Sequence, residues 1–119
     1  MNITYYICEM KKILLTLLFL PMMGLGQSLT IGDTYQGGII FWLNGNNSGG
    51  LIAAPVDQST SASWGCVGQW TTGASNWSIG GGAQNTIDMV NSCPSSPAAN
   101  ICLNLTLGGW SDWYLPSID

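Results

Sequence analysis

The most regular feature of the chain is a pair of apolar runs separated by a polar turn. Residues 35–43 and 51–54 are rich in branched and aromatic side chains, whereas residues 44–50 are all Asn, Gly and Ser. Gly and Asn tolerate the positive φ that tight turns require, so the pattern predicts a β-hairpin. Gly37 and Gly38, near the start of the first strand, indicate a bulge or a close approach of two backbones.

Apolar positions at helical spacing follow further along the chain. Residues 97–105 place four apolar side chains at i, i+3, i+4 and i+7, which predicts a helix: Ala98, Ile101, Cys102 and Leu105. Residues 84–92 predict a second short helix, with Ile87, Met89 and Val90 on its buried side.

A short aromatic run stands at the end of the sequence. Residues 113–115 predict a buried strand, and Pro116 ends it because proline cannot donate to a ladder. Ser117 suits a helix N-cap with Asp119 in the first turn, so a helix is expected to begin where the sequence stops. Together the elements predict a loop-rich α+β fold, a β-hairpin plus two short helices, that is incomplete at its C-terminus. We therefore expect a fragment of a longer protein.

The first 26 residues have the pattern of a secretory signal peptide. Two lysines precede the apolar residues 13–20, and Gly24 and Gly26 occupy the −3 and −1 positions of a cut after Gly26. The apolar run is well short of the roughly 20 residues that a membrane span needs. Met10 followed by two lysines is itself a typical signal-peptide beginning, which makes Met10 an alternative start. We expect a bacterial protein that is exported, either secreted or on the outer cell surface, with no transmembrane span in its mature form.

Removal of residues 1–26 would leave a chain without a basic side chain, because both lysines lie in the leader and the sequence has no Arg or His. The remaining charged side chains are all aspartates: Asp33, Asp57, Asp88, Asp112 and Asp119. Binding of nucleic acid or sulfated polysaccharide by counterion release requires Lys or Arg. Neither partner is therefore expected for residues 27–119.

Three cysteines follow the leader, namely Cys66, Cys93 and Cys102. Export permits disulfides, and an odd number leaves one cysteine over. We expect Cys93 and Cys102 to pair and close the loop between them, which contributes about 2–3 kcal/mol in the chain-entropy description. Cys66 would then be free, or paired with residues outside this sequence. Zinc is a poor alternative, because histidine is absent and the cysteine spacings are not those of a structural site.

Three segments occur in a recognisable order: residues 31–41, residues 50–58 followed by Trp64-Gly65-Cys66, and residues 109–117 with the sequence GWSDWYLPS. Together they resemble a bacterial domain-of-unknown-function family typified by the C-terminal domain of the Legionella collagen-like adhesin, common in secreted proteins of the Bacteroidetes. The GWSDWYLPS block is the most specific segment. Its Leu-Pro-Ser element is also similar to one in formylglycine-generating-enzyme and C-type-lectin-like domains.

The resemblance implies a C-type-lectin-like α+β fold, with irregular loops held by buried aromatic residues and a role in adhesion. It covers nearly all of residues 27–119 as the N-terminal part of such a domain. Two departures limit what it implies. Members of the family continue through a helix and further strands, and the glycosaminoglycan binding of the adhesin calls for cationic residues that residues 27–119 lack. That activity is therefore not expected here.

Residues 56–83 are mostly loop and contain three tryptophans. Binding residues concentrate in loops, and exposed aromatic faces there can bind a glycan or a protein partner. Trp64, Trp70 and Trp77 are therefore the candidate ligand-binding residues. The alternative is that they pin the loop onto the core.

Residues 110–117 could either bind a sugar on their aromatic faces or stabilise the fold, and we expect the structural role. The motif residues are Trp110, Asp112, Trp113, Tyr114, Leu115, Pro116 and Ser117. Four further residues offer oxygen donors that suit calcium: Asn44, Asn46, Asn47 and Asp57. EF-hand spacing is absent and Asn-Gly turns need no metal, so we expect no cofactor.

Catalysis is not expected. After the cut no His, Lys or Glu remains as a general base, no two aspartates are adjacent, and Cys66 has no cationic side chain in the mature sequence to lower its pKa. The sequence predicts an exported, noncatalytic surface recognition or adhesion module whose partner is an extracellular glycan or protein. The alternatives are a purely structural module of a larger extracellular protein and a nonfunctional gene fragment.

Overall fold

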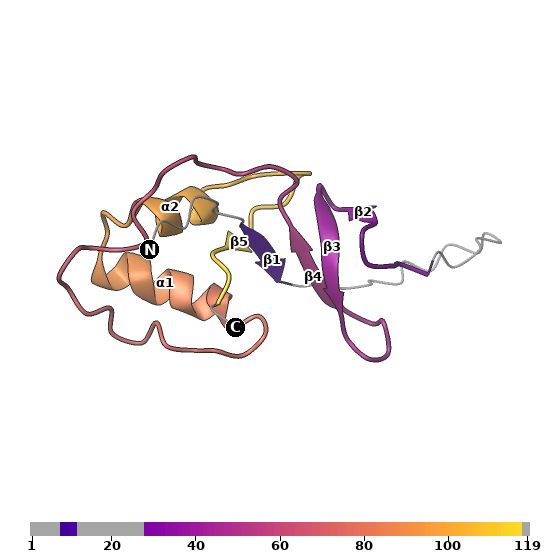
Figure 1. The fold of residues 1–119 in the computed structure, drawn as a ribbon, viewed down its shortest axis with the longest axis horizontal. Coiled ribbons are helices and arrows are strands. Elements are labelled where there is room, and N and C mark those ends of the chain that lie inside the picture. Colours follow the sequence, from indigo (N-terminus) through magenta and orange to yellow (C-terminus); the bar gives the residue numbers. More distant parts are fainter. Residues whose placement is uncertain (1–7, 12–27, 118–119) are drawn as a thin grey trace.

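Short strands form one antiparallel sheet with two helices at one end (Figure 1). The computed structural model describes residues 8–11 and 28–117. The order across the sheet is β2-β3-β4-β1-β5, where the strands are β1 Glu9–Lys11, β2 Thr34–Tyr35, β3 Gly38–Leu43, β4 Gly50–Ala53 and β5 Trp113–Tyr114. Helices α1 (Gly82–Ser92) and α2 (Pro97–Leu103) lie beside the β5 end. The described part is therefore α+β, as the sequence predicts.

The predicted hairpin is confirmed by the pairing of β3 with β4. Ile40 lies opposite Ile52 and Leu43 opposite Gly50, with a bulge between Ile40 and Trp42. The turn closes through Asn44, whose backbone N–H donates to the Gly49 carbonyl at 2.9 Å and whose Oδ1 accepts from the backbone N–H of Ser48 at 2.9 Å. The Asn- and Gly-rich sequence thus folds back by satisfying its own polar groups.

The close backbone approach predicted near Gly37 is also present. Gly37 and Gly108 both have positive φ, and a Cβ atom built on Gly37 would lie 2.7 Å from the Cα of Gly108. Glycine is required at both positions, because a side chain fits neither the space nor the backbone conformation. This contact brings the turn before β3 against the turn that precedes β5.

Both predicted helices are present, but the buried side of α1 differs from the prediction. Met89 is buried, whereas Ile87 is exposed and the buried position next to it is Thr86. Thr86 can occupy this buried position because its hydroxyl forms hydrogen bonds within the protein interior. Thr86 Oγ1 donates to the Gly82 carbonyl at 2.7 Å and accepts from the backbone N–H of Leu115 at 2.9 Å. The prediction of Ile87 on the buried side was therefore wrong.

The core lies where the helices meet the sheet. In α2 the buried side chains are Ala98, Ala99 and Cys102. They join buried residues of the sheet and of α1 in one cluster: Cys8, Ile40, Ile52, Ala54, Met89, Trp113 and Leu115. The predicted strand at residues 113–115 is confirmed as β5, and its aromatic residues Trp113 and Tyr114 are among the largest fully buried side chains. Residues 118–119, where the predicted helix would begin, lie outside the described part.

The predicted Cys93–Cys102 disulfide was wrong. Cys66 pairs with Cys93, and Cys102 pairs with Cys8. Cys93 follows the end of α1 and meets the loop that carries Cys66, whereas Cys102 lies on the buried face of α2, toward the sheet. Most of α2 lies between Cys93 and Cys102, so the two side chains face different parts of the protein: the loop for Cys93 and the sheet for Cys102. Cys66 is therefore bonded rather than free, and both bonds indicate a nonreducing environment.

The N-terminal region differs from the expectation that the fold begins at Gln27. Cys8 is buried, and β1 lies between β4 and β5. Residues 12–27, which include the apolar run and the expected cleavage position, lie outside the described part, so the signal peptide stays a prediction. Among residues 8–11 and 28–117, no helix is long and apolar enough to cross a membrane.

Candidate functional site

The long connection between β4 and α1 carries the candidate tryptophans and lacks helix or strand throughout. It leaves the sheet at Ala54, runs around the helices and returns to begin α1 at Gly82 (Figure 1). Trp64 and Trp77 line the same groove, together with Asn85 and Met89 of α1. Trp70 lies between them in sequence but does not line this groove.

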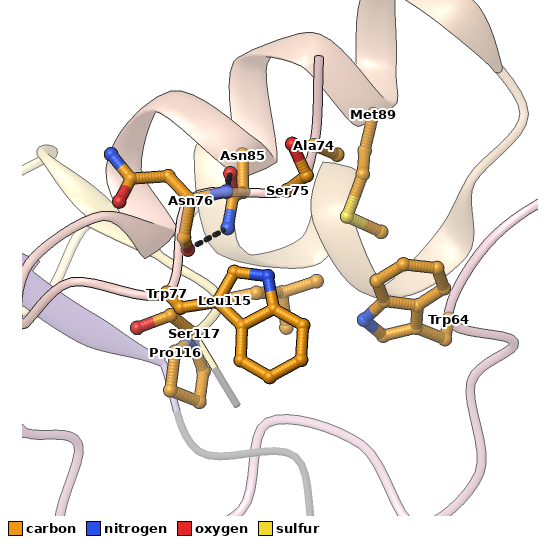
Figure 2. Close-up of a pocket in the computed structure, with 10 residues that line it drawn as sticks. All are labelled: Trp64, Ala74, Ser75, Asn76, Trp77, Asn85, Met89, Leu115, Pro116 and Ser117. Atoms are coloured by element: carbon orange, nitrogen blue, oxygen red, sulfur yellow. Dashed lines mark hydrogen bonds between the residues drawn. The ribbon is translucent and has the colours of Figure 1, made fainter. Parts of the chain in front are cut away.

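Trp64 and Trp77 flank a groove, here named the Trp64–Trp77 groove, with a volume of about 230 Å³. Figure 2 shows the two indoles on either side of a hollow, with the Met89 side chain reaching toward the gap between them. The exposed fraction is 49% for Trp64 and 72% for Trp77, so both rings face solvent. The lining residues are Trp64, Ala74, Ser75, Asn76, Trp77, Asn85, Met89, Leu115, Pro116 and Ser117.

Three tethers hold the Trp64 side of the groove, two at the start of α2 and one at the end of α1. The buried Ser96 donates its hydroxyl to the Trp64 carbonyl at 2.8 Å, and the Ala98 backbone N–H donates to the Ser63 carbonyl at 3.2 Å. Two residues after Trp64, the Cys66–Cys93 disulfide joins the loop to the end of α1. The backbone of Trp64 is therefore fixed, although its ring remains accessible.

The Trp77 side is held by a paired amide contact with α1. The Asn85 side chain accepts from the Asn76 backbone N–H at 2.9 Å and donates to the Asn76 carbonyl at 2.7 Å (Figure 2). Asn76 Oδ1 accepts in turn from the Ser78 backbone N–H at 3.0 Å. The Ser117 hydroxyl donates to the Ser78 carbonyl at 3.2 Å, which links this turn to the chain beyond β5. These bonds flank Trp77 on both sides and position it without burying its ring.

The floor of the groove comes from elements that the core already fixes. Met89 is 1% exposed and projects from α1, and Leu115 follows β5 directly. The bond from the Leu115 N–H to Thr86 ties this segment to α1. The groove therefore has a rigid apolar floor, two aromatic walls, and amide and hydroxyl groups at its rim.

The chemistry of the lining limits the ligands that fit. None of the lining residues is charged, so the groove offers no ion pair to a charged ligand. Its volume is below the range of about 300–1,000 Å³ that is usual for drug-sized ligands. Aromatic faces beside amide and hydroxyl groups suit a neutral ligand that presents an apolar face and several hydroxyls, about the size of one sugar ring.

The other predicted residues lie elsewhere. Trp70 is 98% exposed and does not line the groove. Trp110 and Asp112 are exposed on the turn before β5, where the Trp113 indole donates to the Trp110 carbonyl at 3.1 Å. Trp113, Tyr114 and Leu115 are buried. The block of residues 110–117 thus divides between an exposed turn, a buried strand and the groove lining at its end.

The rim residues Asn76 and Asn85 are missing from the sequence predictions. Asn76 directly precedes Trp77, yet asparagine is common in loops for conformational reasons alone, so its position gives no binding signal. Asn85 falls within a predicted helix and reaches Asn76 only through the fold. The pair is a tertiary contact with no signal in sequence spacing.

Two of the four oxygen donors considered for calcium have partners in their own turn. Asn44 Oδ1 and Asn46 Oδ1 both accept from the Ser48 backbone N–H. Within residues 8–11 and 28–117, no cluster of three or more His, Cys, Asp or Glu side chains is present. Asp33 accepts two hydrogen bonds within its own turn. The Thr30 backbone N–H and hydroxyl both donate to it at 2.9 Å, and these bonds lower the pKa of its carboxyl.

No family model, curated protein or solved structure matches this chain.

Proposed function

We propose that this protein is an exported, noncatalytic surface recognition module that binds a neutral glycan in the Trp64–Trp77 groove. The observation that carries the proposal is the pairing of two solvent-facing indoles on a rigid floor. Contiguous apolar surface rimmed by polar groups is typical of binding sites, whereas single exposed apolar side chains are common on any protein surface. One sugar ring stacks on an indole while its hydroxyls reach the rim of Asn76 and Ser117.

The tethers of the loop support recognition because they lower the entropic cost of binding. A long loop that ordered only on ligand contact would lose much of the binding energy to its own immobilisation. Here a disulfide and the bonds from Ser96 and Asn85 hold the loop before any ligand arrives. The arrangement is preorganised around Trp64 and Trp77.

The resemblance to the adhesin-type family and its C-type-lectin-like fold supports the same function at the level of analogy. Fold likeness by itself does not confer an activity. The proposal therefore rests on the groove, and the uncharged lining favours a neutral sugar over a sulfated one.

The test is an array of neutral and N-acetylated oligosaccharides probed with the full chain, followed by titration of the best oligosaccharide into two variants. Trp77→Ala removes a groove wall, whereas Trp70→Ala removes an equally large aromatic from the same loop outside the groove. We expect Trp77→Ala to weaken binding by about 10-fold or more, which corresponds to about 1.4 kcal/mol, with Trp70→Ala close to wild type.

Two results would contradict the proposal. One is an array on which no oligosaccharide binds above background. The other is binding that depends on Trp70 as strongly as on Trp77. A Trp77→Ala variant that unfolds would instead support the structural-module alternative, and circular dichroism of each variant separates loss of fold from loss of binding.

A further inference from the structure

The two disulfides lie in different environments. Cys8 and Cys102 are 0% and 1% exposed, and both belong to the core cluster. The second bond joins the buried Cys93, which follows the end of α1, to Cys66, which is only partly buried in the connection between β4 and α1. Thiol–disulfide exchange requires that a reductant reach a sulfur atom. Of the sulfur atoms in these two bonds, that of Cys66 is therefore the one most open to attack.

The chain around Cys66 forms a tight turn at the surface. The Gln69 backbone N–H donates to the Cys66 carbonyl at 3.2 Å, and Gly68 has the positive φ that such a turn needs. Val67 is 99% exposed and Trp70 is 98% exposed. Because the side chains on either side of this turn face solvent, a small reductant can approach Cys66 without opening the core.

The Ser95 hydroxyl lies beside both sulfur atoms of the accessible bond. Its oxygen is 3.5 Å from Cys66 Sγ and 3.7 Å from Cys93 Sγ. A disulfide sulfur carries no hydrogen, so the hydroxyl can act only as the donor. Donation to a thiolate is stronger than donation to a neutral sulfur, because the acceptor is charged. Cys93 follows the end of α1, where the helix dipole disfavours negative charge. Ser95 therefore supplies local stabilisation for a thiolate that forms on Cys93.

The same bond is the covalent tether of the Trp64 wall of the groove. Cys66 is the only cysteine among residues 56–83, so its bond is the one disulfide that holds this segment to the helices. The other two tethers of the wall are the hydrogen bonds from Ser96 and Ala98. Cys66 and Cys93 are 27 residues apart in sequence, and breaking their bond returns conformational freedom to the chain between them. Reduction would therefore loosen this wall and leave the core disulfide in place.

We propose that the Cys66–Cys93 disulfide, here named the Cys66–Cys93 latch, is a redox-sensitive control on the Trp64–Trp77 groove. The oxidised bond keeps the groove assembled, and a dithiol reductant opens it with Ser95 as the positioning residue. Once the bond is open, the Trp64 segment must be ordered again when a ligand binds, which lowers affinity. The effect on glycan binding rests on the proposed function, whereas the opening of the bond does not.

The covalent step is a two-stage thiol–disulfide exchange. A thiolate of the dithiol attacks Cys66 Sγ, a mixed disulfide forms there, and the bond to Cys93 breaks. The electron pair of the broken bond stays on Cys93 Sγ, which accepts a hydrogen bond from Ser95 and then takes up a proton. The second thiol of the reductant then attacks the mixed disulfide and releases Cys66 as a thiolate, which is also protonated. The dithiol is oxidised to a disulfide by two electrons, and the two cysteines are reduced to thiols.

The first experiment follows the order of reduction in the full chain. The oxidised protein is treated with dithiothreitol, samples are quenched with N-ethylmaleimide, and mass spectrometry locates the labelled cysteines. Cys66 and Cys93 should be labelled at least about 10-fold faster than Cys8 and Cys102, because access limits the exchange. Ser95→Ala keeps all four cysteines and changes an exposed side chain. It should slow opening of the latch by about 5-fold, the factor expected for the loss of one hydrogen bond, and leave the core disulfide unaffected.

The second experiment measures what opening the latch does to the groove. In the protein whose latch alone is reduced, the indole N–H resonance of Trp64 should shift while that of the buried Trp113 stays in place. An oligosaccharide that binds the oxidised protein should bind this form about 10-fold more weakly, and reoxidation should restore its affinity. The double variant with Cys66→Ser and Cys93→Ser should match the reduced form without any reductant present.

Three outcomes would overturn the proposal. The first is labelling of all four cysteines at one rate, or reduction of Ser95→Ala as fast as wild type. The second is an unchanged Trp64 resonance after the latch opens. The third is a shift of the Trp113 resonance together with that of Trp64, which would mean that the bond holds the whole fold. If the oxidised chain binds no oligosaccharide, the proposed function fails, while the labelling order and the indole resonances still test the latch.

Discussion

Replacement of Thr86 by valine isolates the contact that joins α1 to the segment after β5. Thr86 is fully buried, and its hydroxyl both donates to the Gly82 carbonyl and accepts from the Leu115 N–H. Valine keeps the branched shape but cannot accept a hydrogen bond, so the Leu115 N–H would be left without this buried partner. The change therefore tests whether a polar group holds the floor of the groove in place.

The expected magnitude follows from the two bonds lost. A buried donor left unsatisfied costs about 1–3 kcal/mol, and the lost bond to Gly82 adds a smaller amount, which gives about 2–3 kcal/mol for Thr86→Val. Thr86→Ser is the control, because it keeps the hydroxyl and removes one methyl group. Its cost is about 1 kcal/mol from lost apolar burial.

The assay is urea unfolding of the full chain under oxidising conditions, followed by tryptophan fluorescence. With a slope typical of small domains, Thr86→Val should lower the unfolding midpoint by about 1–2 M urea, and Thr86→Ser by about half as much or less. A valine variant as stable as wild type, or a serine variant less stable than the valine variant, would refute the role assigned to the hydroxyl.

Three further predictions concern the loop, the turns and pH. Asn85→Ala removes both bonds to Asn76 and should cost about 1–2 kcal/mol in urea unfolding, whereas Gln84→Ala, which loses only an exposed bond to Asp88, should stay close to wild type. Gly37→Ala should cost about 2 kcal/mol or more by the same measurement, because its φ is positive and the new Cβ would meet Gly108. The bonds from Thr30 lower the pKa of the Asp33 carboxyl in the folded protein below its ordinary value of 3.8. The ionised carboxylate therefore stabilises the folded state above the unfolded pKa, and this stabilisation is lost as pH falls through the folded pKa. Asp33→Asn should therefore lose less stability than wild type between neutral and acidic pH, and an unchanged pH profile would contradict this.

The elements that the sequence predicted correctly depend on local chemistry. The hairpin follows from a polar turn between two apolar runs, and its Asn44 side chain closes the turn within six residues. The predicted helices likewise follow from spacing within single segments. The close approach at Gly37 could be anticipated because paired glycines in a strand need a reason, although its partner Gly108 could not be named.

The features that the sequence did not predict depend on contacts between distant segments. Disulfide connectivity is a property of the folded chain, so nearness in sequence favoured Cys93–Cys102, whereas the fold joins Cys8 to Cys102 across 94 residues. The buried position of Thr86 was missed because a hydrophobicity pattern cannot reveal that the Leu115 N–H arrives from 29 residues away to satisfy its hydroxyl. The three loop tryptophans were equivalent in sequence, and only the fold separates Trp70 from Trp64 and Trp77.

The measurement that tests the groove most directly is a titration of the indole N–H resonances of ¹⁵N-labelled full chain with neutral oligosaccharides. The protein has six tryptophans, so each indole can be assigned by a single Trp→Phe variant. We predict that an oligosaccharide shifts the Trp64 and Trp77 resonances together and saturably, while those of Trp70 and the buried Trp113 stay in place. A saturable shift confined to Trp70 or Trp110, or no shift with any neutral oligosaccharide, would contradict a glycan site in the Trp64–Trp77 groove.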